Sequence, residues 1–112
     1  MIIHHLAFRT ADLGRLERFY VDVLGLVVTR RSERSVWLDA GGTILMLERA
    51  EPGEPEARPG TMELVAFGAS DGMKERLTTA GVAFEDRTAY SLYFRDPDGR
   101  RLGISSYPEL LA

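Results

Sequence analysis

The 112-residue sequence contains no cysteine. Disulfide bonds, thiolate metal ligands and a cysteine nucleophile are therefore excluded. The sequence also lacks an excess of positive charge, because 17 Asp and Glu outnumber 14 Lys and Arg and give a formal net charge of −3. Without a basic field, the chain is expected to bind neither nucleic acid nor an anionic membrane surface.

Long apolar runs are missing as well. No apolar stretch reaches the roughly 20 residues that a membrane-spanning helix needs. The amino end, residues 1–5, has neither the basic segment nor the apolar run of a signal peptide. A cytoplasmic location is therefore expected. With 45% hydrophobic and 28% charged residues, the composition is that of one ordinary globular domain.

The first half of the sequence predicts a strand, a helix and three further strands. An apolar run over residues 2–8 is short enough for a strand, and Asp12 is a candidate helix N-cap. The helix carries one apolar stripe at spacings i, i+3, i+4, i+7 and i+8, formed by Leu16, Phe19, Tyr20, Val23 and Leu24. Gly25 is expected to end the helix. Strands are predicted over residues 26–31, 35–39 and 43–48.

A linker and a second copy of the same order follow. Residues 50–60 contain three prolines and two glycines, so they continue neither a helix nor a strand. The next segments predict a strand over 62–67, a short helix capped by Ser70 or Asp71 and ended by Gly81, and strands over 82–87, 91–95 and 101–105. The repeated order predicts two βαβββ modules, about residues 1–49 and 61–112, in a single domain spanning 1–112.

Two motifs, one near each end of the chain, resemble those of a known family. The first is His5-Leu6-Ala7-Phe8, followed by Asp12 and the segment 19–26, and the second is the turn sequence of residues 94–100. Together they resemble the vicinal-oxygen-chelate superfamily, which includes glyoxalases, bleomycin-resistance proteins and ring-cleaving dioxygenases. The resemblance implies an α+β fold in which two βαβββ modules form a cupped eight-stranded mixed sheet with the helices outside. It also implies a homodimer.

In the metal-dependent relatives, each half supplies one ligand from its first strand and one from its last, all facing the cup. Strand alternation directs Leu6 and Phe8 towards the helix and His5 towards the cup. The same alternation places Glu48 in the cup. The resemblance therefore makes His5 and Glu48 candidate metal ligands. The alternative is a hydrogen-bonded pair that binds a ligand or acts as acid and base.

The second half departs from this pattern. Leu64 and Gly103 occupy its two expected ligand positions, and neither side chain has a donor atom. Open catalytic metal sites normally keep three protein ligands. We therefore predict no cofactor and no tightly bound metal, and at most a weakly held divalent ion on His5 and Glu48.

The other cup-facing positions predict a small-molecule site. Trp37 and Tyr93 would add aromatic surface to it, and Arg9 and Arg101 would add polar groups. An apolar pocket with few polar anchors is the usual composition of a ligand site. The alternative is that a partner subunit or the other half fills the space. The small or apolar residues expected to leave a cavity are Ala7, Ile44, Met46, Leu64, Ala66, Gly68 and Gly103.

Three functions are consistent with these features. The first, which we favour, is binding of a small organic molecule in the cupped sheet, as in bleomycin-resistance or orphan glyoxalase-like proteins, without a tightly bound metal. The second is a divalent-metal-dependent lyase, isomerase or dioxygenase in which His5 and Glu48 hold the ion that polarises vicinal substrate oxygens. The third is a structural or regulatory dimer without a ligand.

Overall fold

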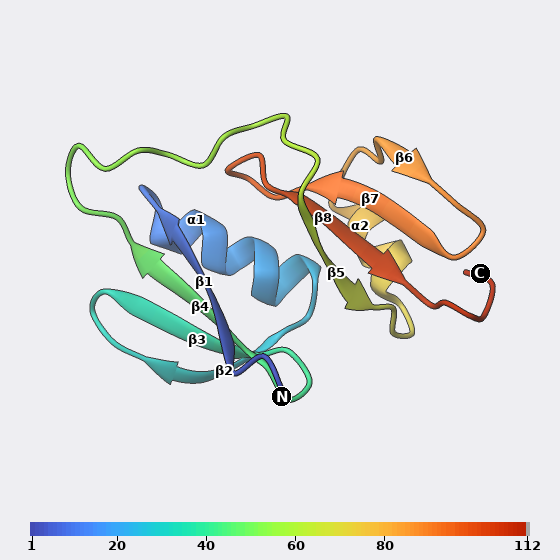
Figure 1. Cartoon of the computed structure of the whole chain (residues 1–112), viewed down its shortest axis with the longest axis horizontal. Helices are drawn as coiled ribbons and strands as arrows, with labels where there is room; N and C mark the ends of the chain where they lie inside the picture. Colours follow the sequence, from blue (N-terminus) through green and yellow to red (C-terminus); the bar gives the residue numbers. More distant parts are fainter. Residues whose placement is uncertain (112) are drawn as a thin grey trace. The chain divides into compact units, whose positions relative to one another are not determined.

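The computed structural model of the chain describes residues 1–111, which divide after Ala57 into two compact units. Each unit contains one four-stranded sheet, with strand orders β1-β4-β3-β2 and β5-β8-β7-β6 (Figure 1). In both sheets the first strand runs parallel to the last, while the other neighbours are antiparallel. The predicted α+β fold of two βαβββ modules is confirmed. The joining of the sheets into one cup stays a prediction.

The first unit is built from β1 (His5–Thr10), α1 (Leu13–Arg18), the π-helix η1 (Phe19–Val23), β2 (Val27–Arg31), β3 (Ser35–Asp39) and β4 (Ile44–Arg49). Asp12 is the predicted N-cap, and its Oδ1 accepts a hydrogen bond of 3.0 Å from the Arg15 amide. Alternate residues of β3 and β4 are buried on one face of the sheet, namely Val36, Leu38, Leu45 and Leu47. This face and the buried stripe of α1 and η1 form the core of the unit.

The predicted regular α-helix is wrong over its second half. The backbone widens at η1, where the Leu24 amide donates to the Phe19 carbonyl oxygen at 3.1 Å, five residues back. The adjacent aromatic side chains Phe19 and Tyr20 are both buried. The Tyr20 ring lies 6.0 Å from that of Phe8 on β1, centroid to centroid, so the wider turn still packs on the sheet. Gly25 ends the helix with φ of 82°, as predicted.

The second unit is built from β5 (Leu64–Gly68), α2 (Met73–Thr79), β6 (Asp86–Arg87), β7 (Ser91–Arg95) and β8 (Arg101–Ser105). Two predictions were wrong here. Neither Ser70 nor Asp71 caps α2 with its side chain, because Gly72 is the N-cap. The strand predicted over 82–87 is reduced to β6, since the Val82 amide closes the end of α2 on the Leu77 carbonyl at 3.0 Å. No helix among residues 1–111 is long and apolar enough to cross a membrane.

Candidate functional site

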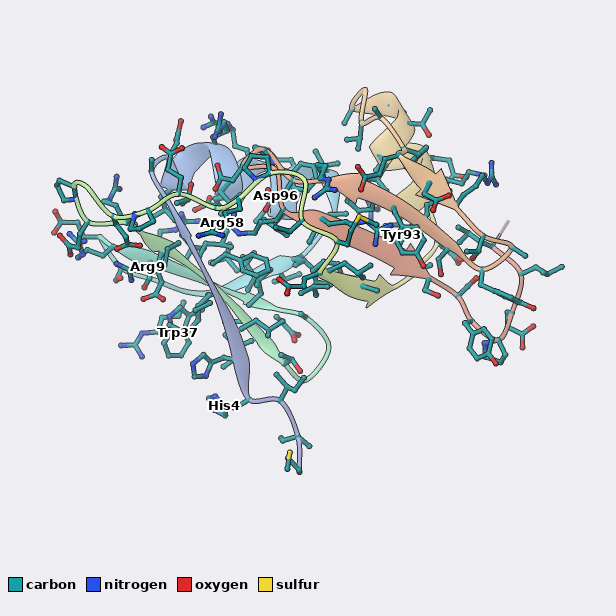
Figure 2. The ribbon with its side chains drawn as sticks, turned by 45° about the horizontal axis from the view of Figure 1, so that its top comes forward. His4, Arg9, Trp37, Arg58, Tyr93 and Asp96 are labelled. Carbon is teal, nitrogen blue, oxygen red and sulfur yellow. The ribbon has the colours of Figure 1, made fainter. Side chains whose placement is uncertain are left out.

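The face of the first sheet opposite α1 carries the side chains that alternation assigns to the cup, among them Arg9 and Trp37, which Figure 2 labels. The strand register arranges them in three rows across β1, β4 and β3. All of them are exposed or half-buried, whereas their neighbours in β3 and β4 are buried. The predicted alternation is therefore confirmed. The rows are His5, Ile44 and Asp39, then Ala7, Met46 and Trp37, then Arg9, Glu48 and Ser35.

His5 and Glu48 share this face but lie at opposite ends of it. His5 pairs with Ile44, while Glu48 pairs with Arg9, four positions farther along β1. At about 3.3 Å per residue this separation is about 13 Å along the strands. The His5 Nδ1 instead lies 2.9 Å from the Nδ1 of His4, and Glu48 Oε2 lies 3.8 Å from Arg9 Nη1. The interpretation of a hydrogen-bonded His5–Glu48 pair is therefore wrong.

The register also shows which residues of the two modules are equivalent. Ala7 pairs with Met46, and Ala66, in the matching Val-Ala-Phe segment, pairs with Gly103. Met46 is therefore the counterpart of Gly103, and Glu48 lies two residues beyond that position. Alternation assigned Glu48 to the cup but could not distinguish it from Met46, which faces the same way, whereas strand pairing fixes the register. The four equivalent positions hold His5, Met46, Leu64 and Gly103.

These four positions offer few metal donors. They supply one imidazole, one thioether and two side chains without a donor atom. Hard or borderline divalent ions prefer oxygen and imidazole ligands over a thioether. Among residues 1–111, no three His, Asp or Glu side chains come together in a group that could hold a metal ion.

Trp37 provides aromatic surface on the first sheet. It pairs with Met46 on one side and with Arg30 of β2 on the other. The guanidinium carbon of Arg30 lies 5.0 Å from the centroid of the indole ring, which is a cation–π distance. Ala7, Met46 and Trp37 form what we name the central row, an apolar strip across three strands. Ala7 is exposed, and the other two side chains are half-buried.

Arg9 lies next to the central row and is held by carboxylates. Its Nε donates to Glu54 Oε2 at 2.6 Å, and its Nη2 donates to Glu54 Oε1 at 2.8 Å. The hydrogen bond from Arg9 lowers the pKa of Glu54, and the Glu51 amide adds to this effect. The same hydrogen bond raises the pKa of Arg9. The sequence interpretation missed Glu54, because an acidic residue in a linker 45 positions away carries no specific signal.

On the equivalent face of the second sheet, an aromatic ring covers the central glycine. The ring of Tyr93 lies against Gly103, which is buried. A Cβ atom on Gly103 would be 3.0 Å from Cδ1 and 3.2 Å from Cε1 of that ring. The small residue was expected to leave a cavity, and at this position the expectation was wrong because Tyr93 fills the space. Leu64 remains 38% exposed, and Ala66 is also exposed.

The polar groups of this second face satisfy one another. The guanidinium carbon of Arg101 lies 4.6 Å from the centroid of the Tyr93 ring, and its Nε donates to Glu85 Oε1 at 3.1 Å. The other oxygen of Glu85 accepts from Arg95 Nε at 3.0 Å. Hydrogen bonds from Arg95 first, and from Arg101, lower the pKa of Glu85 despite its partial desolvation. The sequence interpretation did not include Glu85 or Arg95.

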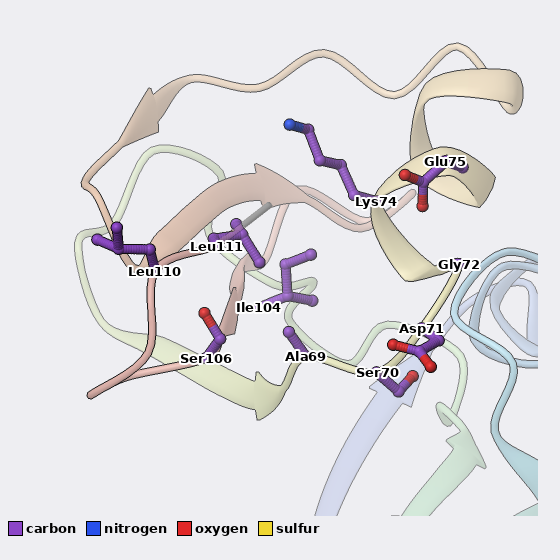
Figure 3. A pocket seen from close by; sticks show the side chains of 10 residues that line it. All are labelled: Ala69, Ser70, Asp71, Gly72, Lys74, Glu75, Ile104, Ser106, Leu110 and Leu111. Atoms are coloured by element: carbon purple, nitrogen blue, oxygen red, sulfur yellow. The ribbon is translucent and has the colours of Figure 1, made fainter.

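A pocket of about 270 Å³ lies elsewhere in the second unit, beside the start of α2 (Figure 3). None of the predicted site residues lines it. The lining contains one basic residue, Lys74, and two acidic residues, Asp71 and Glu75. It therefore has no single sign of charge that would select a ligand. The lining residues are Ala69, Ser70, Asp71, Gly72, Lys74, Glu75, Ile104, Ser106, Leu110 and Leu111.

Comparison with known proteins gives a consistent family match. Residues 2–104 match the profile of the Glyoxalase/Bleomycin resistance protein/Dioxygenase superfamily. Virulence protein STM3117 of Salmonella typhimurium is 28% identical over 120 residues, covering 94% of this chain and 83% of that protein. Its crystal structure superposes with a TM-score of 0.72 at 25% identity, covering 94% of this chain and 95% of that chain.

Two further solved structures are similar over almost the whole chain. Lactoylglutathione lyase from Agrobacterium tumefaciens superposes with a TM-score of 0.70 at 26% identity, covering 93% of this chain and 92% of that one. The integron cassette protein VPC_CASS1 of V. Pseudocholerae superposes with a TM-score of 0.77 at 25% identity, covering 97% and 96%.

Proposed function

We propose that this chain, which belongs to the Glyoxalase/Bleomycin resistance protein/Dioxygenase superfamily, binds a small planar organic molecule. The binding surface is the face of the first sheet that lies away from α1. One observation carries the proposal: the central row presents an indole, a thioether and an exposed alanine side by side. Such a strip, flanked by the charged pair Arg9 and Glu48, has the apolar surface and sparse polar anchors typical of ligand sites. The function resembles that of bleomycin-resistance or orphan glyoxalase-like proteins.

The first sheet suits this role better than the second. On the second sheet Tyr93 rests on Gly103, so an incoming ring would have to displace a side chain that is already packed. Arg101 and Glu85 there are engaged with each other and with neighbours. On the first sheet Met46 stands at the position equivalent to Gly103 and pairs with Trp37. A ligand ring could lie over Ala7 and Met46 beside the indole ring, which Arg30 already contacts at 5.0 Å.

Binding is proposed to occur without a tightly bound metal. The support is the donor set, since the four equivalent positions include only one imidazole and Glu48 lies about 13 Å along the strands from His5. These residues do not fit the shell that a metal-dependent lyase, isomerase or dioxygenase requires. Elemental analysis of protein purified without an affinity-tag metal tests this point. One equivalent of Fe, Mn, Ni or Zn per chain, abolished by His5→Ala, would overturn it and favour the metalloenzyme alternative.

The ligand face is tested by following the indole N–H resonance of Trp37, the one tryptophan of the chain, during titration with phenol and benzamide. We expect shifts that saturate in the millimolar range, as is usual for such small ligands. Ala7→Glu should abolish the shifts because it places a charge in the central row. Ala66→Glu, at the equivalent exposed position of the second sheet, should leave them unchanged. Unchanged binding by Ala7→Glu, or no binding of either probe, would overturn the proposal.

The homodimer is likewise a proposal. The first strand of each module is an edge strand with an unpaired side within its own sheet, and such edges are commonly paired or covered. Light scattering at micromolar concentration should give twice the mass of the chain. A mass equal to that of one chain would contradict the proposal.

A further inference from the structure

The segment that follows β4 forms an ordered turn, which we name the strap (residues 50–54). The Ala50 amide donates to the Thr10 carbonyl at 2.9 Å, which ties the strap to the end of β1. The Glu54 amide donates to the Glu51 carbonyl at 3.1 Å across a turn with Pro52 second and Gly53 third, and Gly53 has φ of 80°. Proline at the second position and a positive φ at the third define a type II turn. The turn therefore directs the Glu54 side chain onto Arg9.

The contact between Glu54 and Arg9 has the geometry by which arginine recognises a carboxylate. Both oxygens of Glu54 meet one edge of the guanidinium, the one formed by Nε and Nη2. This bidentate arrangement is the same one that binds carboxylate ligands. Glu48 lies 3.8 Å from Nη1, at a different part of the group. The Nε–Nη2 edge is thus already shaped and occupied by a carboxylate that belongs to the protein.

This internal carboxylate is exchangeable. The Arg9 side chain is 42% exposed and that of Glu54 is 23% exposed. Exposed ion pairs contribute little net stability, since water and salt compete with them. Arg9 also lies only two positions along β1 from Ala7, about 7 Å from the central row. A ring seated on the central row could therefore extend a carboxylate to the edge that Glu54 occupies.

We infer that Arg9 anchors a carboxylate group of the ligand and that Glu54 is an internal competitor which the ligand displaces from the Nε–Nη2 edge. The inference rests on the proposed function and deepens it, because it names the ligand class as small aromatic carboxylates. An occupied anchor lowers the apparent affinity by the fraction of time for which it is open. Removing the competitor should therefore tighten the binding of carboxylates and leave uncharged rings unaffected.

The test compares benzoate with benzamide, which share a ring and differ in charge, by the Trp37 indole signal in the full chain. Glu54→Gln should lower the Kd of benzoate about tenfold, corresponding to an edge that is open about a tenth of the time. The Kd of benzamide should change less than about twofold. Glu56→Gln is the matched control, since it removes one negative charge from an exposed residue of the same linker. It should leave both constants unchanged.

Two further variants separate competition from charge. Gly53→Ala keeps every charge but strains the turn at its positive φ, so it should tighten benzoate binding by a smaller factor, about threefold. Arg9→Gln should weaken benzoate below benzamide, because Glu48 and Glu54 then remain there without the cation. In the unmutated chain, benzoate but not benzamide should shift the backbone amide signals of Glu51 and Glu54, because the strap is released.

The outcomes are distinguishable. If benzamide binds every variant but Glu54→Gln does not tighten benzoate, the inference is overturned and the proposed function stands. Equal tightening by Glu54→Gln and Glu56→Gln also overturns the inference, since the effect is then one of general charge. If neither probe binds any variant, the proposed function fails and the inference fails with it.

Discussion

The faces of the two sheets that lie away from the helices have the same backbone register but differ in how their central rows are packed. Their central rows are Ala7, Met46 and Trp37 in the first and Ala66, Gly103 and Tyr93 in the second. In the second row the Tyr93 ring lies against the glycine of the neighbouring strand, and Arg101 lies over the ring. In the first row Met46 stands in place of the glycine. The two rows thus differ chiefly at their middle position, where only the glycine lets the aromatic ring pack directly over the backbone.

The largest expected effect comes from adding a side chain at Gly103, over which the Tyr93 ring packs. Gly103→Ala should destabilise the protein by about 1–3 kcal/mol, because its Cβ would lie 3.0 Å from the Tyr93 ring and overpacked sites cost about this much. Urea denaturation measures the change. Gly68→Ala on the same sheet is the control, since a Cβ atom added there would have no neighbour within 4 Å, and it should stay within about 0.5 kcal/mol. Equal stabilities of the two variants would show that Tyr93 does not fill this space.

The two arginine–aromatic contacts should differ in how much they stabilise the protein, with the larger contribution on the second sheet. Arg101→Met should cost about 1–2 kcal/mol, because the Arg101 side chain is only 9% exposed and loses a largely desolvated contact with Tyr93. Arg30→Met, which removes the exposed cation from Trp37, should cost less than about 0.5 kcal/mol. Thermal unfolding of both variants checks this order. A larger cost for Arg30→Met would reverse the distinction between a closed and an open face.

Low pH should destabilise the folded protein through the ion pairs on both sheets. Glu54 beside Arg9 and Glu85 beside Arg95 and Arg101 have folded pKa values below the ordinary value of 4.5. Because the unfolded chain binds these protons more readily, the stabilisation is fully present above the ordinary pKa and is lost as the pH falls through the lowered folded pKa.

Denaturation midpoints at pH 7 and pH 3 measure this loss of stability. Glu54→Gln and Glu85→Gln should each lose less stability than the unmutated chain over that interval. A loss equal to that of the unmutated chain in both variants would contradict the assigned role of the ion pairs.

The smallest expected effect concerns His5. Its side chain is exposed and its hydrogen bond is to the adjacent, equally exposed His4. His5→Gln should therefore change the free energy of unfolding by less than about 0.5 kcal/mol. A change above about 1 kcal/mol by urea denaturation would reveal a structural role that the exposed ring does not indicate.

Sequence patterns predicted what depends on local periodicity. The strands Ser35–Asp39, Ser91–Arg95 and Arg101–Ser105 have the predicted bounds, and the faces of Trp37 and Met46 follow from a period of two. The strand predicted to begin at Val82 begins later, because the Val82 amide donates to the Leu77 carbonyl at the end of α2.

The features that could not be predicted depend on pairing between distant segments. The placement of Glu48 opposite Arg9 follows from the register of β1 and β4, which alternation alone leaves undetermined. Whether Tyr93 fills the space above Gly103 depends on packing between strands. The bidentate contact between Arg9 and Glu54 depends on a turn within residues 50–60, which were predicted only to be a linker.

The pairing of first and last strands has a consequence for how the protein is made. His5 pairs with Ile44 and Leu64 pairs with Arg101, so each module is completed by the segment synthesised last within it. During translation β1 has no sheet partner until β4 has been synthesised, and β5 has none until β8 has been synthesised. Such long-range parallel pairing forms slowly, because the intervening chain must be ordered first. Each module is thus expected to add its parallel strand pair last, with the first module completed before the second has been fully synthesised.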